Sequence, residues 1–435
     1  MKQLIITMLL FFTIFVKAQE TPVKPITLSL EQAVNFAISN NINQKVLGIG
    51  KLISVEEYLQ SKRDILPSLS ASASQSLSNS HSDVGGGTSS SGNYGISSQM
   101  TLYNGSQNWN AIRLNSLRTS QEDSKIAQAL NELTLQVIES FLNILMNDEL
   151  LKYQQEVEKK SESQLKQGQV QYKAGQILES DYLLLESQYA TDKYNVINTM
   201  INRNNALLQL KNELSLDPSD VLDIVPPDTS IAGIAMDLPA LDEVITKTLE
   251  WLPDLQISRQ NIQLAALQTR ISKGAFLPVL SLGASVGTGY NGGDPSLNTQ
   301  LENGLNEQVS LTLSVPIWNR GKVKSNVRMN QYYEAQTSLQ AQQTEYNVRQ
   351  QLEQEYQNVI SAYNRFLASS AKHYAQGEVF RTYGAQFEAG SITAVDLLQQ
   401  QTNYLSALND YIQNKYNFIL NRKVIDVYMG IPITW

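Results

Sequence analysis

The sequence contains an internal duplication, and this feature limits the possible folds more than any other. Leu66-Pro67 recurs as Leu277-Pro278, 211 residues later, and a run of small and apolar residues follows in both places. The segment Tyr172-Lys173-Ala174-Gly175 recurs as Phe387-Glu388-Ala389-Gly390, 215 residues later. We therefore expect two halves with the same order of elements, and a four-residue insertion in the second half within 278–318.

The repeat and the local composition divide the chain into segments. The predicted first half spans 19–216 and the second half 239–430. The Pro- and Asp-rich stretch 217–238 between them predicts an irregular linker. A short tail, 431–435, follows the second half.

Residues 1–18 have the pattern of a signal peptide. Lys2 provides a positive start, an apolar run extends over 4–16, and Ala18 is a small residue suited to cleavage. The apolar run is too short to cross a bilayer as a helix, and the alternative is an uncleaved anchor. The pattern predicts export from the cytoplasm.

The chain has no cysteine and two isolated histidines, His81 and His373. Disulfides, thiolate metal sites and lipidation of an N-terminal cysteine are therefore excluded. Isolated histidines predict no metal centre and no catalytic triad, and we expect no cofactor. A net charge of −8 without any basic run argues against a nucleic-acid partner.

Each half contains two segments in which apolar and small polar residues alternate strictly. These predict strands at about 67–78 and 93–103 in the first half, and at about 278–288 and 307–317 in the second. Their length of about ten residues also fits tilted membrane strands. The alternative is the edge of a soluble β-sandwich.

Helical periodicity occupies most of the remaining sequence. Pairs of shorter helices are expected at 29–40 and about 43–64, and at 240–250 and about 254–275. The segment from about 107 to 171 has no proline and an apolar seam with spacings of three and four residues, which is typical of coiled coils. Such a helix would be on the order of 100 Å long, which suits a tube better than a compact domain.

Four strands of this kind cannot be stable alone in a membrane. Open sheet edges do not occur in hydrocarbon, and closed membrane barrels begin at about eight strands. If the strands enter a membrane, several copies of the chain must share one barrel. The expected assembly is a ring-shaped homo-oligomer.

The order and spacing of these features resemble the TolC family of outer-membrane efflux proteins. The resemblance covers about 28–430 and rests on the duplication, the Leu-Pro before the strands, the turn 314–321 (SVPIWNRG) and the two Ala-Gly helix breaks. It implies a mainly α fold with a membrane β-barrel, built from a duplicated helix–strand–strand–helix-hairpin unit. A homotrimer would share a 12-stranded barrel, continued by a long periplasmic α-helical barrel.

The resemblance also implies a function and partners. The chain would be a passive, non-enzymatic exit duct in the outer membrane of a Gram-negative bacterium, in contact with outer-membrane lipid and extending into the periplasm. A periplasmic adaptor and an inner-membrane pump of the RND or ABC type would complete the system. The alternative is a periplasmic coiled-coil scaffold without a pore. The sequence does not identify the cargo.

The helix breaks carry the candidate functional residues. Glycine tolerates the positive φ that ends a helix, and acidic residues follow in each restarting helix, so the simplest interpretation is helix capping. The resemblance places these turns at the periplasmic tip, with gate candidates Glu179, Asp181, Asp396 and Gln399. Gln399 stands where the family has a second carboxylate, so the gate ring would be less acidic. The adaptor-docking candidates are Tyr172, Ala174, Gly175, Phe387, Ala389 and Gly390.

Aromatic residues near the strand ends are candidates for the membrane interface, and the alternative is ordinary packing. They are Tyr94, Tyr103, Trp109, Tyr290 and Trp318. The segment 287–292 fits G-x-G-x-x-G, but no helix is expected directly after it, so we predict a glycine-rich external loop there and a similar loop at 78–93. No nucleophile elbow, phosphate loop or metal cluster is recognisable.

Overall fold

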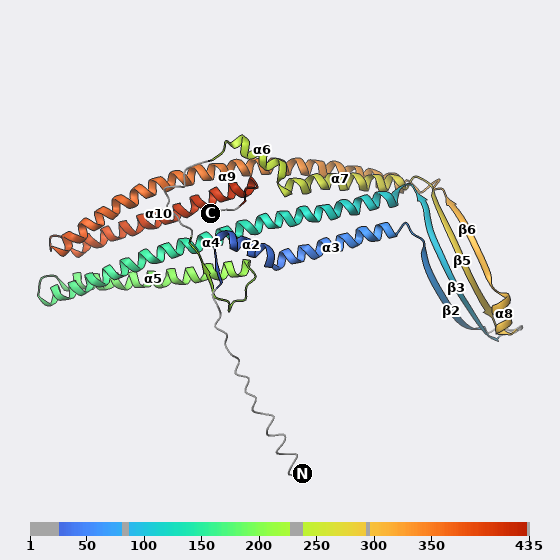
Figure 1. The fold of residues 1–435 in the computed structure, drawn as a ribbon, viewed down its shortest axis with the longest axis horizontal. Helices are drawn as coiled ribbons and strands as arrows, with labels where there is room; N and C mark the ends of the chain where they lie inside the picture. The colour runs from blue at the N-terminus through green and yellow to red at the C-terminus, as the bar shows by residue number, and fades with distance from the viewer. Residues whose placement is uncertain (1–25, 81–86, 227–237, 293–295, 433–435) are drawn as a thin grey trace, which may run out of the picture.

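The computed structural model describes residues 26–80, 87–226, 238–292 and 296–432. The predicted signal peptide lies outside these residues. The described chain is elongated, with long helices along one axis and a curved sheet at one end (Figure 1). No helix in the described ranges is both long and apolar enough to cross a membrane.

Corresponding helices in the two halves have identical lengths. The first half contains α2 (Leu30–Asn40), α3 (Ile42–Arg63), α4 (Gln107–Lys173) and α5 (Glu179–Glu213), of 11, 22, 67 and 35 residues. The second half repeats these lengths in α6 (Leu241–Trp251), α7 (Pro253–Gly274), α9 (Lys322–Glu388) and α10 (Ala394–Tyr428). Each half thus ends in a hairpin of two long helices, and both hairpins extend away from the sheet (Figure 1).

Four antiparallel strands form one sheet in the order β2-β3-β5-β6. They are β2 (Ser68–Ser80), β3 (Gly87–Asn104), β5 (Val279–Asn291) and β6 (Asn306–Ser314). β3 and β5 join the two halves, whereas β2 and β6 are the edges. Neither edge strand has a second partner within the described chain.

The register gathers the apolar residues on one face. Ile96 of β3 lies between Ala71 and Val286, and Leu282 of β5 lies between Met100 and Leu311. Serine, glycine and threonine occupy the opposite face, as the alternation predicted. The apolar face is uncovered: Leu69 is 79% exposed and Val309 77% exposed.

A β-bulge changes one predicted face. The alternation put Leu102 in line with Met100, but the register shifts between Thr101 and Tyr103, so that Tyr103 pairs with Leu280. Leu102 is therefore the extra residue, and Tyr103 takes its place in the apolar row. A bulge inserts one unpaired residue into a strand, and the alternation pattern does not mark that position.

Other segments also differ from the sequence predictions. Residues 78–80, 87–93 and 287–291 are strand rather than loop, because β2 pairs with β3 as far as Ser80 and Gly87, and β3 pairs with β5 as far as Ser91 and Asn291. Residues 81–86 lie outside the described residues. α8 (Leu297–Asn303) forms a short helix in a predicted loop. β6 ends at Ser314 rather than near 317, because its partner β5 begins at Val279.

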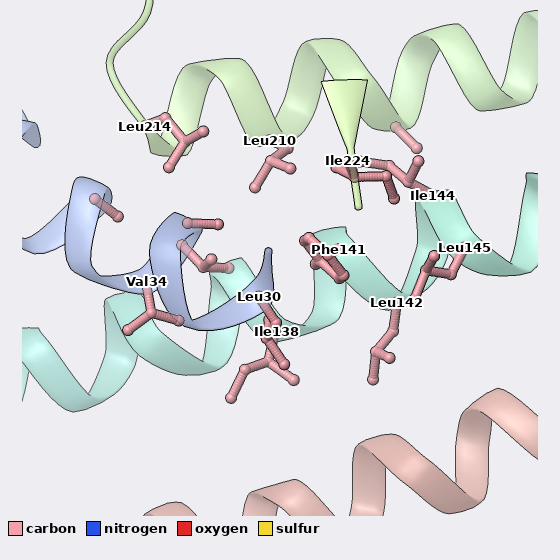
Figure 2. Packing of buried hydrophobic residues seen from close by; sticks show 14 of the residues in the cluster. Leu30, Val34, Ile138, Phe141, Leu142, Ile144, Leu145, Leu210, Leu214 and Ile224 are labelled. Atoms are coloured by element: carbon pink, nitrogen blue, oxygen red, sulfur yellow. The ribbon is translucent and has the colours of Figure 1, made fainter. Parts of the chain in front are cut away.

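The predicted irregular linker contains a short strand. β4 (Leu222–Ile224) pairs in parallel with β1 (Ile26–Leu28), far from the four-stranded sheet. Residues 227–237 of the linker lie outside the described ranges. The small sheet joins the main apolar core, in which α2, α4, α5 and β4 meet. Figure 2 shows ten labelled residues of this core, among them Leu30, Phe141 and Leu210, with buried side chains.

The change from strand to helix uses the same backbone in both halves. Gly105 and Ser106 have φ of 66° and 62°, and their counterparts Arg320 and Gly321 have φ of 55° and 75°. Two successive left-handed residues turn the chain sharply into α4 and α9. Gly105 also lies against the end of α7, since a Cβ there would be 2.3 Å from the carbonyl oxygen of Gly274.

Candidate functional site: the hairpin turns and the sheet

The two hairpin turns end their first helices in the same way. Gly175 and Gly390 have φ of 71° and 73°. The Gly175 N–H donates to the Tyr172 carbonyl at 2.9 Å, and the Gly390 N–H donates to the Phe387 carbonyl at 3.0 Å. The residue after each glycine also donates its N–H to a carbonyl one turn earlier in the helix. The two bonds together form a Schellman motif, which satisfies the last carbonyls of the helix.

The second helix of each hairpin begins differently. At α10, the Asp396 N–H donates to the Thr393 hydroxyl oxygen at 3.2 Å, and the Asp396 carboxylate accepts from the Thr393 N–H at 3.2 Å. This is a capping box. At α5, Leu178 occupies the cap position and gives no side-chain bond. The structure therefore fixes the Asp396 carboxylate in a cap and leaves that of Asp181 uncapped.

The gate candidates lie at or near the two hairpin turns, which border one groove. A groove runs between the two turns, and its lining includes Asp181 from one hairpin and Thr393 from the other. Asp396 and Glu179 are exposed in the first turns of their helices. Gln399 is exposed one turn further along α10, and its amide donates to Asn403 at 3.3 Å. Their role as a gate stays a prediction.

The docking candidates divide into an exposed and a buried group. Tyr172 is 39% exposed and stacks on Tyr182 at 5.6 Å, and space around both turn glycines is open. Ala174 and Ala389 are exposed as well. Phe387 is 4% exposed, so its side chain supports the tip from inside. Direct contact with a partner protein would therefore fall to the exposed group.

A small apolar core joins the two hairpins at this end. It contains Leu185 of α5, Phe380 and Phe387 of α9, and Ala394 and Leu397 of α10. This core cannot be recognised as a unit in the sequence. The apolar spacing on each helix was visible, but which helices meet depends on tertiary packing.

A buried ion pair joins the hairpins further from the turns. The Lys415 ammonium of α10 donates to Glu149 of α4 at 2.7 Å, and the Tyr416 hydroxyl donates to the same carboxylate at 2.8 Å. Burial, reinforced by the Glu149 charge, raises the pKa of the Tyr416 hydroxyl. Lys415 is 6% exposed, and losing either partner would leave an uncompensated buried charge. No local pattern in the sequence marks these residues as partners.

The interface candidates lie at two levels of the sheet. Tyr103, Trp109 and Trp318 lie near the helical end, where Trp318 is 84% exposed beyond β6 and Trp109 is 61% exposed in α4. Tyr94 and Tyr290 lie on the apolar face toward the loops. Nine residues separate Tyr94 from Tyr103 on β3, which corresponds to about 30 Å. This spacing is close to the thickness of a bilayer's hydrocarbon core.

The upper aromatic pair is held by a polar contact. The Tyr94 hydroxyl donates to the Gln75 amide oxygen at 3.3 Å, and the Gln75 amide donates to the Tyr290 hydroxyl. The Tyr290 hydroxyl also lies 3.1 Å from that of Ser90. Gln75 has the register of the apolar face, so this cluster interrupts the apolar band at its loop end. Polar tips on aromatic rings suit a boundary between hydrocarbon and water.

The fold defines a class of protein. The chain has the fold of outer-membrane channel subunits: it matches the crystal structure of CusC with a TM-score of 0.80, at 14% identity over 92% of each chain. It also matches the open-state MtrE outer-membrane channel of Neisseria gonorrhoeae with a TM-score of 0.77, at 19% identity over 93% of this chain and 89% of the other.

Sequence similarity then gives the family. Residues 55–214 and 244–430 match the profile of the outer membrane efflux protein family, and the chain belongs to that family. It is 24% identical to the outer membrane protein TolC of Escherichia coli over 390 residues, which is 86% of this chain and 76% of TolC. It is also 24% identical to the alkaline protease secretion protein AprF of Pseudomonas aeruginosa over 187 residues, 41% of this chain and 37% of AprF.

Proposed function

We propose that this chain is one subunit of a passive exit duct in the outer membrane, which works with a periplasmic adaptor and an inner-membrane pump of the RND or ABC type. The observation that carries the proposal is the four-stranded sheet with one uncovered apolar face and two open edges, at the end of two very long helical hairpins. Membership of the efflux family supports the same conclusion.

The open edges support a shared barrel. β3 of the first half pairs with β5 of the second, and by the same relation β6 of one copy would pair with β2 of the next. This pairing would give partners to both unsatisfied edges, as hydrocarbon requires. It would also extend β6 toward Ile317, which is 92% exposed in a single chain. Three copies would give the 12 strands that the family resemblance implies.

An uncovered helix face supports the same ring. Ile42, Val46, Ile49 and Ile53 form a stripe on α3 with spacings of four, three and four residues, and each is 57–66% exposed. An exposed apolar stripe of this length on a helix indicates a helical partner. α7, the counterpart of α3, packs on both α4 and α9, whereas α3 packs along α4 and only touches α2 at its start. The missing neighbour of α3 would be α9 of the next copy.

The wall of the proposed pore would be neutral in the membrane. Apart from Val279 at the start of β5, the face opposite the apolar one is composed of serine, glycine, threonine, asparagine and glutamine on the described strands, and Glu307 falls in the apolar register. Charge selectivity would then arise at the periplasmic tip, from Asp181, Asp396 and Glu179, with Gln399 reducing the charge of the ring. The exposed docking candidates at the turns would receive the adaptor.

Recording from the purified protein in a planar bilayer tests the proposal. We expect discrete conductance steps, and we expect Asp396→Ala to alter the conductance or its sensitivity to cations. Glu186→Gln, an exposed change on α5 away from the turns, is the matched control and should behave as the unmodified protein. A purified ring that gives no conductance under any opening condition would overturn the proposal. A water-soluble, elongated oligomer that needs no detergent would favour the scaffold.

A further inference from the structure

A buried carboxylate lies between the two hairpins, well away from the turns. Asp192 of α5 is 2% exposed. Its oxygens accept from the Gln188 amide of the same helix at 2.9 Å and from the Gln401 amide of α10 at 2.8 Å. No lysine, arginine or histidine pairs with it among the residues that the structure describes. A buried carboxylate without a cation is costly when ionised.

The duplication shows that this carboxylate is not a general feature of the repeat. The counterpart of Asp192 in the second half, 215 residues later, is Ala407, which is fully buried. The counterpart of Gln401 in the first half is Glu186, which is exposed. An apolar residue therefore satisfies the packing at the equivalent place. The folding of the hairpin therefore does not require the hydrogen bond between Gln401 and Asp192.

Two hydrogen-bond acceptors near Asp192 lack a donor. The amide oxygens of Gln401 and Gln154 are buried and have no hydrogen-bond partner in the described structure. The Ser161 hydroxyl of α4 donates to the Glu158 carbonyl oxygen at 3.0 Å. A hydroxyl has one proton to donate, so this proton does not serve Asp192 at the same time.

A small cavity adjoins the carboxylate. It has a volume of about 140 Å³, lies between α4, α5 and α10, and is lined by Gln154, Val157, Asp192, Asn195, Leu405 and Asn409. The lining offers amide groups and no cationic side chain. Such a polar cavity can hold water that carries a proton to and from the site.

We propose that Asp192 is a proton-binding site that joins the two hairpins. In its neutral form the carboxyl donates its proton to one of the unpartnered oxygens around it, and α10 packs on α4 and α5 without a buried charge. In its ionised form the same contact includes an uncompensated anion, and the hairpins separate more easily. Acid would therefore tighten the duct above its tip, and a rise in pH would loosen it.

The surroundings of Asp192 favour the neutral form of its carboxyl group. Burial raises the pKa of the Asp192 carboxyl above its ordinary value, and the hydrogen bonds that Gln188 and Gln401 donate only partly oppose this effect. On α4, the Glu158 charge raises the pKa further. On α10, the groups at the site are Gln401, Leu405 and Asn409, none of which is charged. A raised pKa in the folded state means stability that is present in acid and lost as the pH rises through that pKa.

The first test compares thermal unfolding of the unmodified protein with Asp192→Asn between pH 5 and pH 8. Asparagine is neutral at every pH and can both donate and accept here. We expect the midpoint of the unmodified protein to fall relative to the variant as the pH rises, by on the order of 2–4 °C. Glu186→Gln, an exposed carboxylate on the same helix, should follow the unmodified protein. Superimposable profiles for all three would overturn the proposal.

A second measurement does not depend on how well the variant folds. Infrared difference spectra of the unmodified protein should contain the carbonyl stretch of a neutral, buried carboxyl group at the acidic end of the pH range, and this band should disappear as the pH rises. Asp192→Asn should lack the band. If the unmodified protein has no such band at any pH above 5, the site does not bind a proton. Neither measurement requires a conducting pore, so failure of this proposal can be distinguished from failure of the proposed function.

Discussion

The two halves of the chain have the same helices but different surroundings. On α4, Leu114 is 6% exposed, whereas its counterpart on α9, Met329, is 48% exposed. Further along, Ser124 of α4 is 6% exposed and its counterpart Leu339 is 65% exposed. The contact of α7 with α4 is thus made once within the chain. The equivalent faces of α3 and α9 are exposed on the outside of the chain, and both carry exposed apolar residues.

This comparison suggests how copies of the chain associate. If the internal contact between halves is repeated between copies, the exposed stripe on α3 and the exposed face of α9 are two sides of one interface. Residues of similar type or conformation in different surroundings should then respond differently to substitution.

The largest effect is expected from a charge in the α3 stripe. Ile53→Asp should abolish ring formation, because an unpaired charge buried in an interface costs roughly 3–5 kcal/mol. The single chain should still fold, since Ile53 is 58% exposed within it. Light scattering of the detergent-solubilised protein measures the assembly. Leu52→Asp, at an adjacent position that is 67% exposed and outside the stripe, should leave the ring intact. Equal loss with both changes would contradict the assignment of the interface.

A smaller effect separates two glycines of the same conformation. Gly390→Ala should cost about 1–2 kcal/mol of stability, because its φ of 73° is strained for any other residue while the space around it is open. Gly105→Ala should cost about 1–3 kcal/mol more, because its Cβ would also collide with the Gly274 backbone. Thermal or denaturant unfolding measures both. Equal losses of stability in the two variants would show that the backbone at Gly274 can move to make room for a Cβ at position 105.

The smallest effect concerns the two hairpin caps. Thr393→Ala should destabilise the start of α10 by about 1 kcal/mol, because it removes the capping box. Leu178→Thr should stabilise the start of α5 by up to a similar amount, since Leu178 has an extended backbone and Asp181 stands three residues later. Hydrogen exchange of the first-turn amides measures both changes. Opposite signs are predicted, and the same sign in both variants would refute the interpretation of the two turns.

The sequence predicted the elements better than their contacts. Periods of 3.6 and 2 are local properties, so the long helices and the alternating strands were visible, as were the glycine ends at Gly175 and Gly390. The bulge at Leu102 and the helix α8 leave no clear mark in an alternation pattern. The burial of Asp192 could not be predicted, because it depends on α4, α5 and α10 meeting at one point.

The candidate site was predicted in part for the same reason. The turn residues were found because glycine and acidic residues follow a local rule for helix ends. The difference in capping between Asp181 and Asp396 was not predicted. It arises because Leu178, at the cap position of α5, has no side-chain hydrogen-bond acceptor. Phe387 looked like a surface aromatic in its motif, but Leu185 and Leu397 bury it from other helices.

Crosslinking between copies tests the central claim most directly, because the chain has no cysteine of its own. Within the chain, the Gln128 amide of α4 donates to Asp254 of α7 at 2.9 Å, and the counterparts of these residues are Gln343 and Asn43. A protein with Asn43→Cys and Gln343→Cys, treated with a short thiol-specific crosslinker, should give covalent dimers and trimers. Asn43→Cys with Gln336→Cys, about 10 Å out of register, should give far fewer. No covalent oligomer with the matched pair, or equal yields from the two pairs, would contradict the account.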